Sequence, residues 1–305
     1  MRRSGTAAAL AVLLALAGCT AAADAGPETR EPAPAVSPSP SDPAKSGIRQ
    51  TGIVYRTVDG TDLALDAYLP AEPIADPVPA IVVVHGGGFT SGSRDGLDAA
   101  PLASVLAQAG YAAFSIDYRL LPEHPYPAAL EDLQAAIRWL REPEQVASFG
   151  IDPARIGAFG GSAGAILVAE AGTAGEGPLD EGARLGAVVA LSGIMDFTEG
   201  ALTPDLGAAD RRTGLAYLDC TDPSACPVGV EASPLAAADP TDPPFYLAHS
   251  VDEELPEQSA VALAEALRAA GGTAELELRP GSAHSVLMLD TAMSERILAF
   301  LAAEL

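Results

Sequence analysis

Two patterns of hydrophobic residues alternate along most of this chain. Short apolar runs rich in β-branched residues, such as residues 79–85, predict strands that are buried on both faces. Longer segments with apolar residues three and four apart, such as residues 127–143, predict amphipathic helices. Further strands are predicted at 112–119, 155–160, 185–193, 244–250 and 274–280, and further helices at 102–111, 163–172, 258–272 and 294–305. The alternation predicts one α/β domain with a mostly parallel sheet covered by helices on both faces.

The segment before the first buried strand has a different pattern. Residues 52–70 form two runs of alternating hydrophobicity on either side of Asp59-Gly60, which predicts a β-hairpin. This hairpin would add antiparallel strands at one edge of the sheet. We therefore place the folded domain at residues 48–305.

The first residues are typical of a targeting segment. Two arginines precede the apolar run 7–18, which ends in the sequence LAGC at residues 16–19. This end resembles the lipobox of bacterial lipoproteins, which implies a signal peptide over 1–18, a lipid on Cys19 and an extracytoplasmic, membrane-anchored protein. The alternative is an ordinary secretory signal cleaved near residues 21–23. Residues 19–47 are rich in Pro, Ala and Ser and predict an extended tether.

Charge excludes one class of partner. The chain of 305 residues carries 17 basic and 41 acidic side chains, giving a formal net charge of −24, and Lys45 is its only lysine. A nucleic-acid-binding protein needs a basic surface, so we expect no nucleic-acid partner. No metal-ligand cluster, nucleotide-binding loop or haem motif stands out, so no metal or other cofactor is implied.

Cys220 and Cys226 are separated by turn-forming residues. An extracytoplasmic setting permits disulfides, so this pair is a candidate for a small covalent loop. Two free thiols or part of a metal site are the alternatives, although further ligands are lacking nearby.

The sequence GGSAG at residues 160–164 has the form G-x-S-x-G and lies between a predicted strand and a predicted helix. A nucleophile elbow requires this context, because the serine occupies a tight turn and glycines avoid clashes on either side of it. Ser162 is therefore the candidate nucleophile. The alternative is a plain turn from strand to helix.

A glycine-rich loop supplies the second chemical signal. The sequence HGGGF at residues 85–89 follows a buried strand and exposes backbone amides that no side chain obstructs. Amides fixed before the reaction are suited to stabilise an oxyanion. Gly87 and Gly88 are the candidate donors, with Ala163 as a third. A flexible turn or a phosphate-binding loop are the alternatives, but no phosphate-binding motif follows the strand.

An acid and a base should follow the serine in the chain. Of four histidines, His284 lies in a loop between the last predicted strand and the last helix and is the candidate base. The other three occupy the glycine loop, a proline-rich connection and a strand end. The acid is expected after the strand 244–250, where Asp252, Glu253 and Glu254 are candidates. Asp252 is preferred because its short carboxylate suits a tight turn.

Together these segments resemble the α/β-hydrolase carboxylesterases, near the hormone-sensitive-lipase-like and feruloyl-esterase-like groups. The resemblance rests on the segments 85–89, 117–132, 150–164, 243–256 and 280–284. It implies an α/β-hydrolase fold, a serine ester hydrolase that forms an acyl-enzyme on small or short-acyl esters, and no cofactor. An amide or peptide hydrolase with the same triad, or a non-catalytic binding lipoprotein, are the alternatives.

The chain departs from the family pattern at the acid. The usual His-Gly-x-x-Asp is replaced here by HSVDE at residues 249–253. Counting forward from His249 selects Glu253, whereas counting back from Leu255-Pro256 selects Asp252. No room is left for a helical cap before the first strands, so the segment 199–232 is expected to flank an open active site.

Overall fold

The computed structural model describes residues 47–71, 76–202 and 206–305. The predicted signal peptide, Cys19 and nearly all of the predicted tether lie outside these residues. Within the described part of the chain, no helix combines the length and the hydrophobicity needed to cross a membrane.

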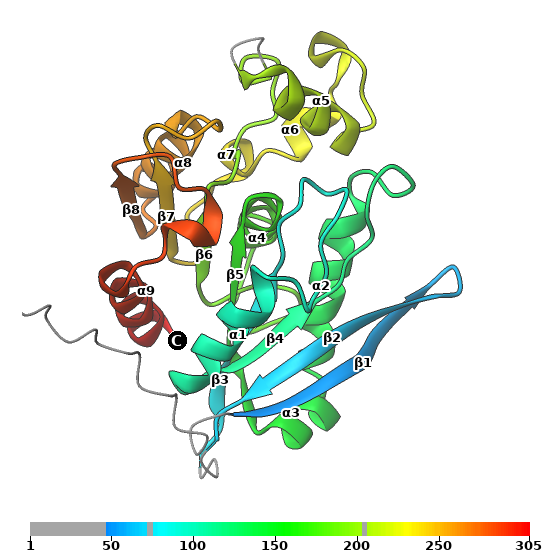
Figure 1. Ribbon diagram of the computed structural model, residues 1–305, viewed down its shortest axis with the longest axis vertical. Helices are drawn as coiled ribbons and strands as arrows, with labels where there is room; N and C mark the ends of the chain where they lie inside the picture. Colours follow the sequence, from blue (N-terminus) through cyan, green and yellow to red (C-terminus); the bar gives the residue numbers. More distant parts are fainter. Residues whose placement is uncertain (1–46, 72–75, 203–205) are drawn as a thin grey trace, which may run out of the picture. The chain divides into compact units, whose positions relative to one another are not determined.

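An eight-stranded sheet forms the centre of the domain (Figure 1). Its strands, in the order in which they lie side by side, are β1 (Ile48–Val58), β2 (Thr61–Leu69), β4 (Ala112–Ile116), β3 (Val78–Val84), β5 (Ile151–Gly161), β6 (Val188–Leu191), β7 (Phe245–Ser250) and β8 (Ala274–Arg279). The pairs β1–β2 and β2–β4 are antiparallel, and all the other pairs are parallel. The predicted fold class, a mostly parallel α/β sheet with an N-terminal antiparallel hairpin, is confirmed.

Helices cover both faces of this sheet because its strands are apolar on both sides. The helices are α1 (Ala99–Gln108), α2 (Ala128–Leu140), α3 (Pro143–Phe149), α4 (Ala163–Gly172), α5 (Ala208–Tyr217), α6 (Val228–Glu231), α7 (Pro234–Ala237), α8 (Gln258–Ala270) and α9 (Thr291–Glu304), with 3₁₀ turns η3 (Pro223–Ala225) and η4 (Ser285–Met288). Ile81 and Val83 of β3 pack on the side of α1 and α9, whereas Val82 and Val84 pack on the side of α2, α4 and α8. This alternation divides the core into two apolar layers.

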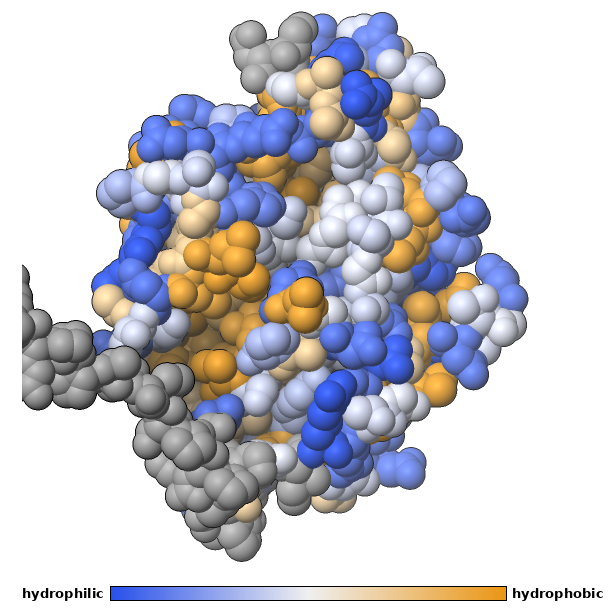
Figure 2. Space-filling model, viewed as in Figure 1, coloured by the Kyte–Doolittle hydropathy of each residue, from blue (hydrophilic) through white to orange (hydrophobic). Residues whose placement is uncertain are grey.

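The face of α1 and α9 carries an apolar hollow of about 410 Å³ (Figure 2). Phe159 lies among its lining residues, with Leu102 and Leu106 of α1 and Ile297 of α9. Leu97 and Leu287 border it and are 97% and 78% exposed. This hollow is separate from the small pocket at Ser162 described below.

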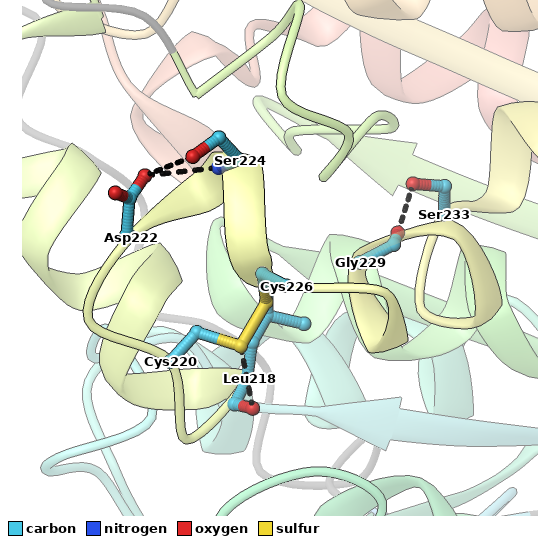
Figure 3. Close-up of a disulfide and its surroundings, with 7 residues drawn as sticks. All are labelled: Leu218, Cys220, Asp222, Ser224, Cys226, Gly229 and Ser233. Atoms are coloured by element: carbon cyan, nitrogen blue, oxygen red, sulfur yellow. Dashed lines mark hydrogen bonds between the residues drawn. A yellow bond between two sulfur atoms is a disulfide. The ribbon is translucent and has the colours of Figure 1, made fainter.

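Between β6 and β7 the chain forms the segment 192–244, which includes α5, η3, α6 and α7. Inside it, Cys220 and Cys226 are joined by a disulfide with an S–S distance of 2.06 Å (Figure 3). The sequence-based expectation of a small covalent loop is therefore confirmed. The disulfide follows α5 directly and links the end of that helix to the turn η3.

Candidate active site

Ser162 occupies the turn between β5 and α4. Its backbone is in the left-handed region, at φ 57°, and its N–H donates to the carbonyl of Leu191 at 2.8 Å. A Cβ at Gly160 would lie 2.2 Å from the carbonyl oxygen of Gly164, and a Cβ at Gly164 would lie 2.1 Å from that of Val84. The two glycines are therefore required for this turn, and the arrangement is that of a nucleophile elbow.

The loop that carries His284 packs against this elbow. A Cβ at Gly161 would lie 1.9 Å from Oγ of Ser285, so the residue after His284 touches the residue before Ser162. In the described part of the chain, no hydrogen bond joins Ser162 to His284. Such catalytic hydrogen bonds are often long before a substrate binds.

The partner of His284 is Glu253. Nδ1 of His284 lies 2.5 Å from Oε2 of Glu253, whose side chain is 1% exposed. Since the carboxylate oxygen accepts, Nδ1 carries the proton and Nε2 is left free to accept one. This is the tautomer that a general base requires.

The expectation that Asp252 would pair with His284 is wrong in this structure. Asp252 is exposed, its N–H donates to the carbonyl of Gly281 at 3.0 Å, and its Oδ2 accepts from the N–H of Gly281 at 3.2 Å. The turn after β7 therefore aims Asp252 along the neighbouring loop. Glu253, the next residue in the turn, points inward, and its longer side chain reaches His284. Counting forward from His249 along the family pattern therefore selects the observed acid, Glu253.

Several donors surround the buried carboxylate of Glu253. Oε1 accepts from Oγ of Ser192 at 2.9 Å and from the backbone N–H of Ser250 at 3.0 Å, and Nε2 of His249 lies 3.1 Å away. Burial by itself would raise the pKa of Glu253. The hydrogen bonds from His284 and Ser250 and the nearby His249 and Ser192 outweigh that effect and lower the pKa, so the carboxylate is held in its charged form.

The glycine loop after β3 is held by contacts of its first two residues, His85 and Gly86. The side chain of His85 is buried and is not part of the pair formed by His284 and Glu253. It stacks on Tyr118 with ring centres 4.2 Å apart. The N–H of Gly86 donates to Oδ2 of Asp98 at 2.7 Å. These contacts hold the glycine loop in place.

Two of the three candidate oxyanion amides belong to residues that line the pocket at Ser162. Within residues 47–71, 76–202 and 206–305, the N–H groups of Gly87, Gly88 and Ala163 donate to no backbone or side-chain acceptor outside regular elements. Ala163 is the first residue of α4, where N–H groups have no partner inside the helix. Gly88 and Ala163 line the same small pocket as Ser162. These are the amides that the sequence pattern indicated.

The pocket beside Ser162 has a volume of about 50 Å³. The residues that line it are Gly88, Phe89, Ser162, Ala163, Ile166, Ile194, Phe197, Asp210, Thr213, Gly214 and Leu255. Most of the side chains are apolar, and five of the residues belong to the segment 192–244. Part of this segment, residues 199–232, was expected to flank the site, but the individual pocket residues were not predicted from the sequence.

Tyr217, at the end of α5, connects the segment 192–244 to the glycine loop. Its ring stacks on that of Phe89 with centres 3.9 Å apart, and its hydroxyl bonds to Oε2 of Glu170 at 2.7 Å. Burial raises the pKa of Glu170 to about 8, so this carboxyl group is protonated at neutral pH. The contacts fix the wall of the pocket next to the candidate oxyanion donors.

Two residues that contact the acid were not predicted from the sequence. They are His249, which lies at the end of a predicted strand, and Ser192. Both lie at the ends of parallel strands, at the same edge of the sheet as Ser162. That shared edge is the signal that could have identified them.

Comparison with known proteins identifies the family of the chain. Residues 65–267 match the family described as BD-FAE. Carboxylesterase NlhH of Mycobacterium tuberculosis is 35% identical over 245 residues, which cover 76% of this chain and 74% of NlhH. Esterase LipC of the same organism is 32% identical and covers 84% of this chain and 66% of LipC.

Solved esterases share the fold. A truncated carbohydrate esterase from gut microbiota superposes with a TM-score of 0.70 at 25% identity, covering 86% of this chain and 98% of that one. Native esterase 2 of Thermogutta terrifontis gives a TM-score of 0.66 at 27% identity, covering 86% and 92%. The chain thus belongs to the BD-FAE family and is an α/β-hydrolase of the carboxylesterase type, within the hormone-sensitive-lipase-like group, that hydrolyses small-molecule esters through a serine.

Proposed function

We propose that Ser162, His284 and Glu253 form the catalytic triad of this esterase. The observation that carries the proposal is the 2.5 Å contact between Nδ1 of His284 and the buried carboxylate of Glu253, in a loop packed against the nucleophile elbow. Nε2 of His284 takes the proton of Ser162 while Oγ attacks the ester carbonyl. Glu253 stays ionised and stabilises the imidazolium that forms.

The N–H groups of Gly87, Gly88 and Ala163 stabilise the oxyanion of the tetrahedral intermediate. They are fixed before the substrate arrives, and each such donor contributes about 3–4 kcal/mol to lowering the barrier. When the intermediate collapses, the alcohol leaves with the proton from His284 and an acyl-Ser162 remains. A water molecule, activated by the same histidine, then hydrolyses this acyl-enzyme.

The substrates are esters with a short acyl chain. A pocket of about 50 Å³ next to Ser162 has room for only a small group, and Ile194, Phe197 and Leu255 close it. Structures of Thermogutta terrifontis esterase 2 with propionate and with butyrate bound support this preference, because that relative shares the fold and 26% sequence identity.

A panel of p-nitrophenyl esters tests this proposal. We expect kcat/KM to be highest for acetate to butyrate and to fall by about 10-fold or more for octanoate, because even one or two poorly accommodated methylenes cost about 1–2 kcal/mol. Labelling of Ser162 by a fluorophosphonate probe, located by mass spectrometry, tests the nucleophile in the same samples. A rate that rises steadily with chain length would contradict the pocket assignment.

We also propose that the mature protein is anchored outside the cytoplasm by a lipid on Cys19. The support is the LAGC sequence at residues 16–19, after an apolar run and two arginines. The tether 19–47 would then hold the catalytic domain away from the membrane surface.

Replacement of Cys19 by serine is expected to abolish lipid attachment, because the thiol is the group that carries the lipid. In cells of a bacterium that processes lipoproteins, the wild type should partition with the membranes, whereas Cys19→Ser should be released or remain unprocessed. Intact mass of the mature wild type gives the direct measurement. An unmodified N-terminus beyond Cys19 in that protein would disprove the anchor.

A further inference from the structure

A fully buried serine lies behind the acid in a backbone conformation that favours glycine. Ser192 follows β6, has a φ of 57° and is 0% exposed. A non-glycine residue in this region is strained, and a buried hydroxyl group destabilises the fold unless it is hydrogen-bonded. The strain and the burial together indicate that this hydroxyl has a use that glycine could not supply.

The hydroxyl of Ser192 joins the loops of the acid and the base. Oγ donates to Oε1 of Glu253 at 2.9 Å and accepts from the backbone N–H of Ser285 at 2.9 Å. Ser285 directly follows His284 and is itself in the left-handed region, at φ 58°. The side chain that follows β6 therefore fixes both partners of the pair, which come from the loops after β7 and β8.

Glu253 needs such support because of its length. A glutamate has one more rotatable bond than an aspartate, so its carboxylate can turn away from the histidine more easily. The N–H of Ser250 is a second donor to Oε1. Nε2 of His249 lies nearer to the carbonyl oxygen of Leu255, at 2.8 Å, than to Oε1, so its proton is shared. The Ser192 hydroxyl is thus the side-chain donor best placed to hold this oxygen.

We propose that Ser192 is a positioning residue for ester hydrolysis, whose hydroxyl holds Glu253 and the His284 loop in mutual alignment. The inference rests on the triad proposed above. Ser192 does not line the pocket at Ser162, so its loss should affect the chemical step rather than the binding of the ester. The expected signature is a lower kcat with little change in KM.

Loss of this donor should also change the pH dependence. The titratable groups that face Glu253 are His249 on β7 and His284 after β8, and Asp210 on α5 acts on His284 through its charge. A hydrogen bond to the charged form of a carboxyl group lowers its pKa, so removal of the Ser192 hydroxyl raises it. The acid–base pair would then bind a proton at higher pH, and the acid limb of kcat/KM should move to higher pH.

The test is Ser192→Gly in the full chain. Glycine suits a φ of 57°, so relief of strain should offset part of the stability lost with the two hydrogen bonds, and the melting temperature should fall less than in Ser192→Ala. The kcat for p-nitrophenyl acetate should nevertheless fall by about 10-fold to 100-fold, which is the range for a lost hydrogen bond to a charged group. KM should change by less than about two-fold. Ser192→Ala should lose the same activity and more stability.

Ser115→Ala is the matched control. Ser115 is also 0% exposed and donates one hydrogen bond, to the carbonyl of Arg94 at 2.7 Å. It lies in β4, which is separated from β6 by β3 and β5. It should lower stability without moving the acid limb. An unchanged kcat and pH profile in Ser192→Gly, or the same shift in Ser115→Ala, would overturn the inference while an active wild type upholds the proposed function. A wild type that neither hydrolyses esters nor reacts with a fluorophosphonate would overturn both.

Discussion

Replacement of Ser162 by alanine is expected to lower kcat/KM for p-nitrophenyl acetate by about four to six orders of magnitude. The covalent step requires Oγ, and only binding and the oxyanion amides would remain to accelerate hydrolysis. The fold should persist, because alanine keeps the Cβ that the turn at φ 57° already accommodates. Steady-state kinetics and a thermal melt of the same sample measure the two effects.

Contamination by other esterases is the main concern with such a large loss. The fluorophosphonate probe distinguishes residual activity of the variant from that of a contaminating serine esterase, since it should label the wild type and not Ser162→Ala. Near-normal turnover by a variant that does not label would remove Ser162 from the mechanism.

Replacement of Glu253 by glutamine is expected to lower kcat by about 10⁴-fold. The amide has nearly the shape of the carboxylate but no charge, and it can favour the wrong tautomer of His284. Burial makes the effect large, because the 1% exposed side chain cannot be replaced by water. The measurement is kcat across a pH series with the short-acyl substrate.

Asp252→Asn is the matched control, since it removes a charge one residue earlier in the same turn. Asp252 is exposed and contacts only Gly281 among the hydrogen bonds of the described residues, so the change in kcat should be less than about three-fold. If Asp252→Asn were the more damaging variant, the acid would have to be reassigned to Asp252. If neither mattered, another strand end would supply it.

The sheet and the nucleophile could be predicted from the sequence because their signals are local. The apolar run at residues 79–85 and the glycines around Ser162 each indicate a local structure that depends only on residues close to them in the sequence. Element ends were less predictable. The helix expected over 127–143 ends at Leu140, and a separate helix α3 begins at Pro143, because proline starts a new helix more readily than it continues one.

The acid could not be predicted with the same certainty, since its position depends on three strand ends that are far apart in the sequence. Whether Asp252 or Glu253 faces His284 is decided by the pairing of Asp252 with Gly281, in the loop after β8. Ser192 was missed for the same reason. Its partners Glu253 and Ser285 are 61 and 93 residues away along the chain.

The segment between β6 and β7 supplies much of the pocket wall but neither the nucleophile, the acid nor the base. Ile194, Phe197, Asp210, Thr213 and Gly214 come from this one stretch, and its disulfide lies wholly inside it. Insertions or exchanges after Ser192 in this segment can alter which esters fit while the catalytic strands keep their register. We therefore expect exchanges between relatives, and directed evolution, to change substrate choice most readily within this one contiguous region.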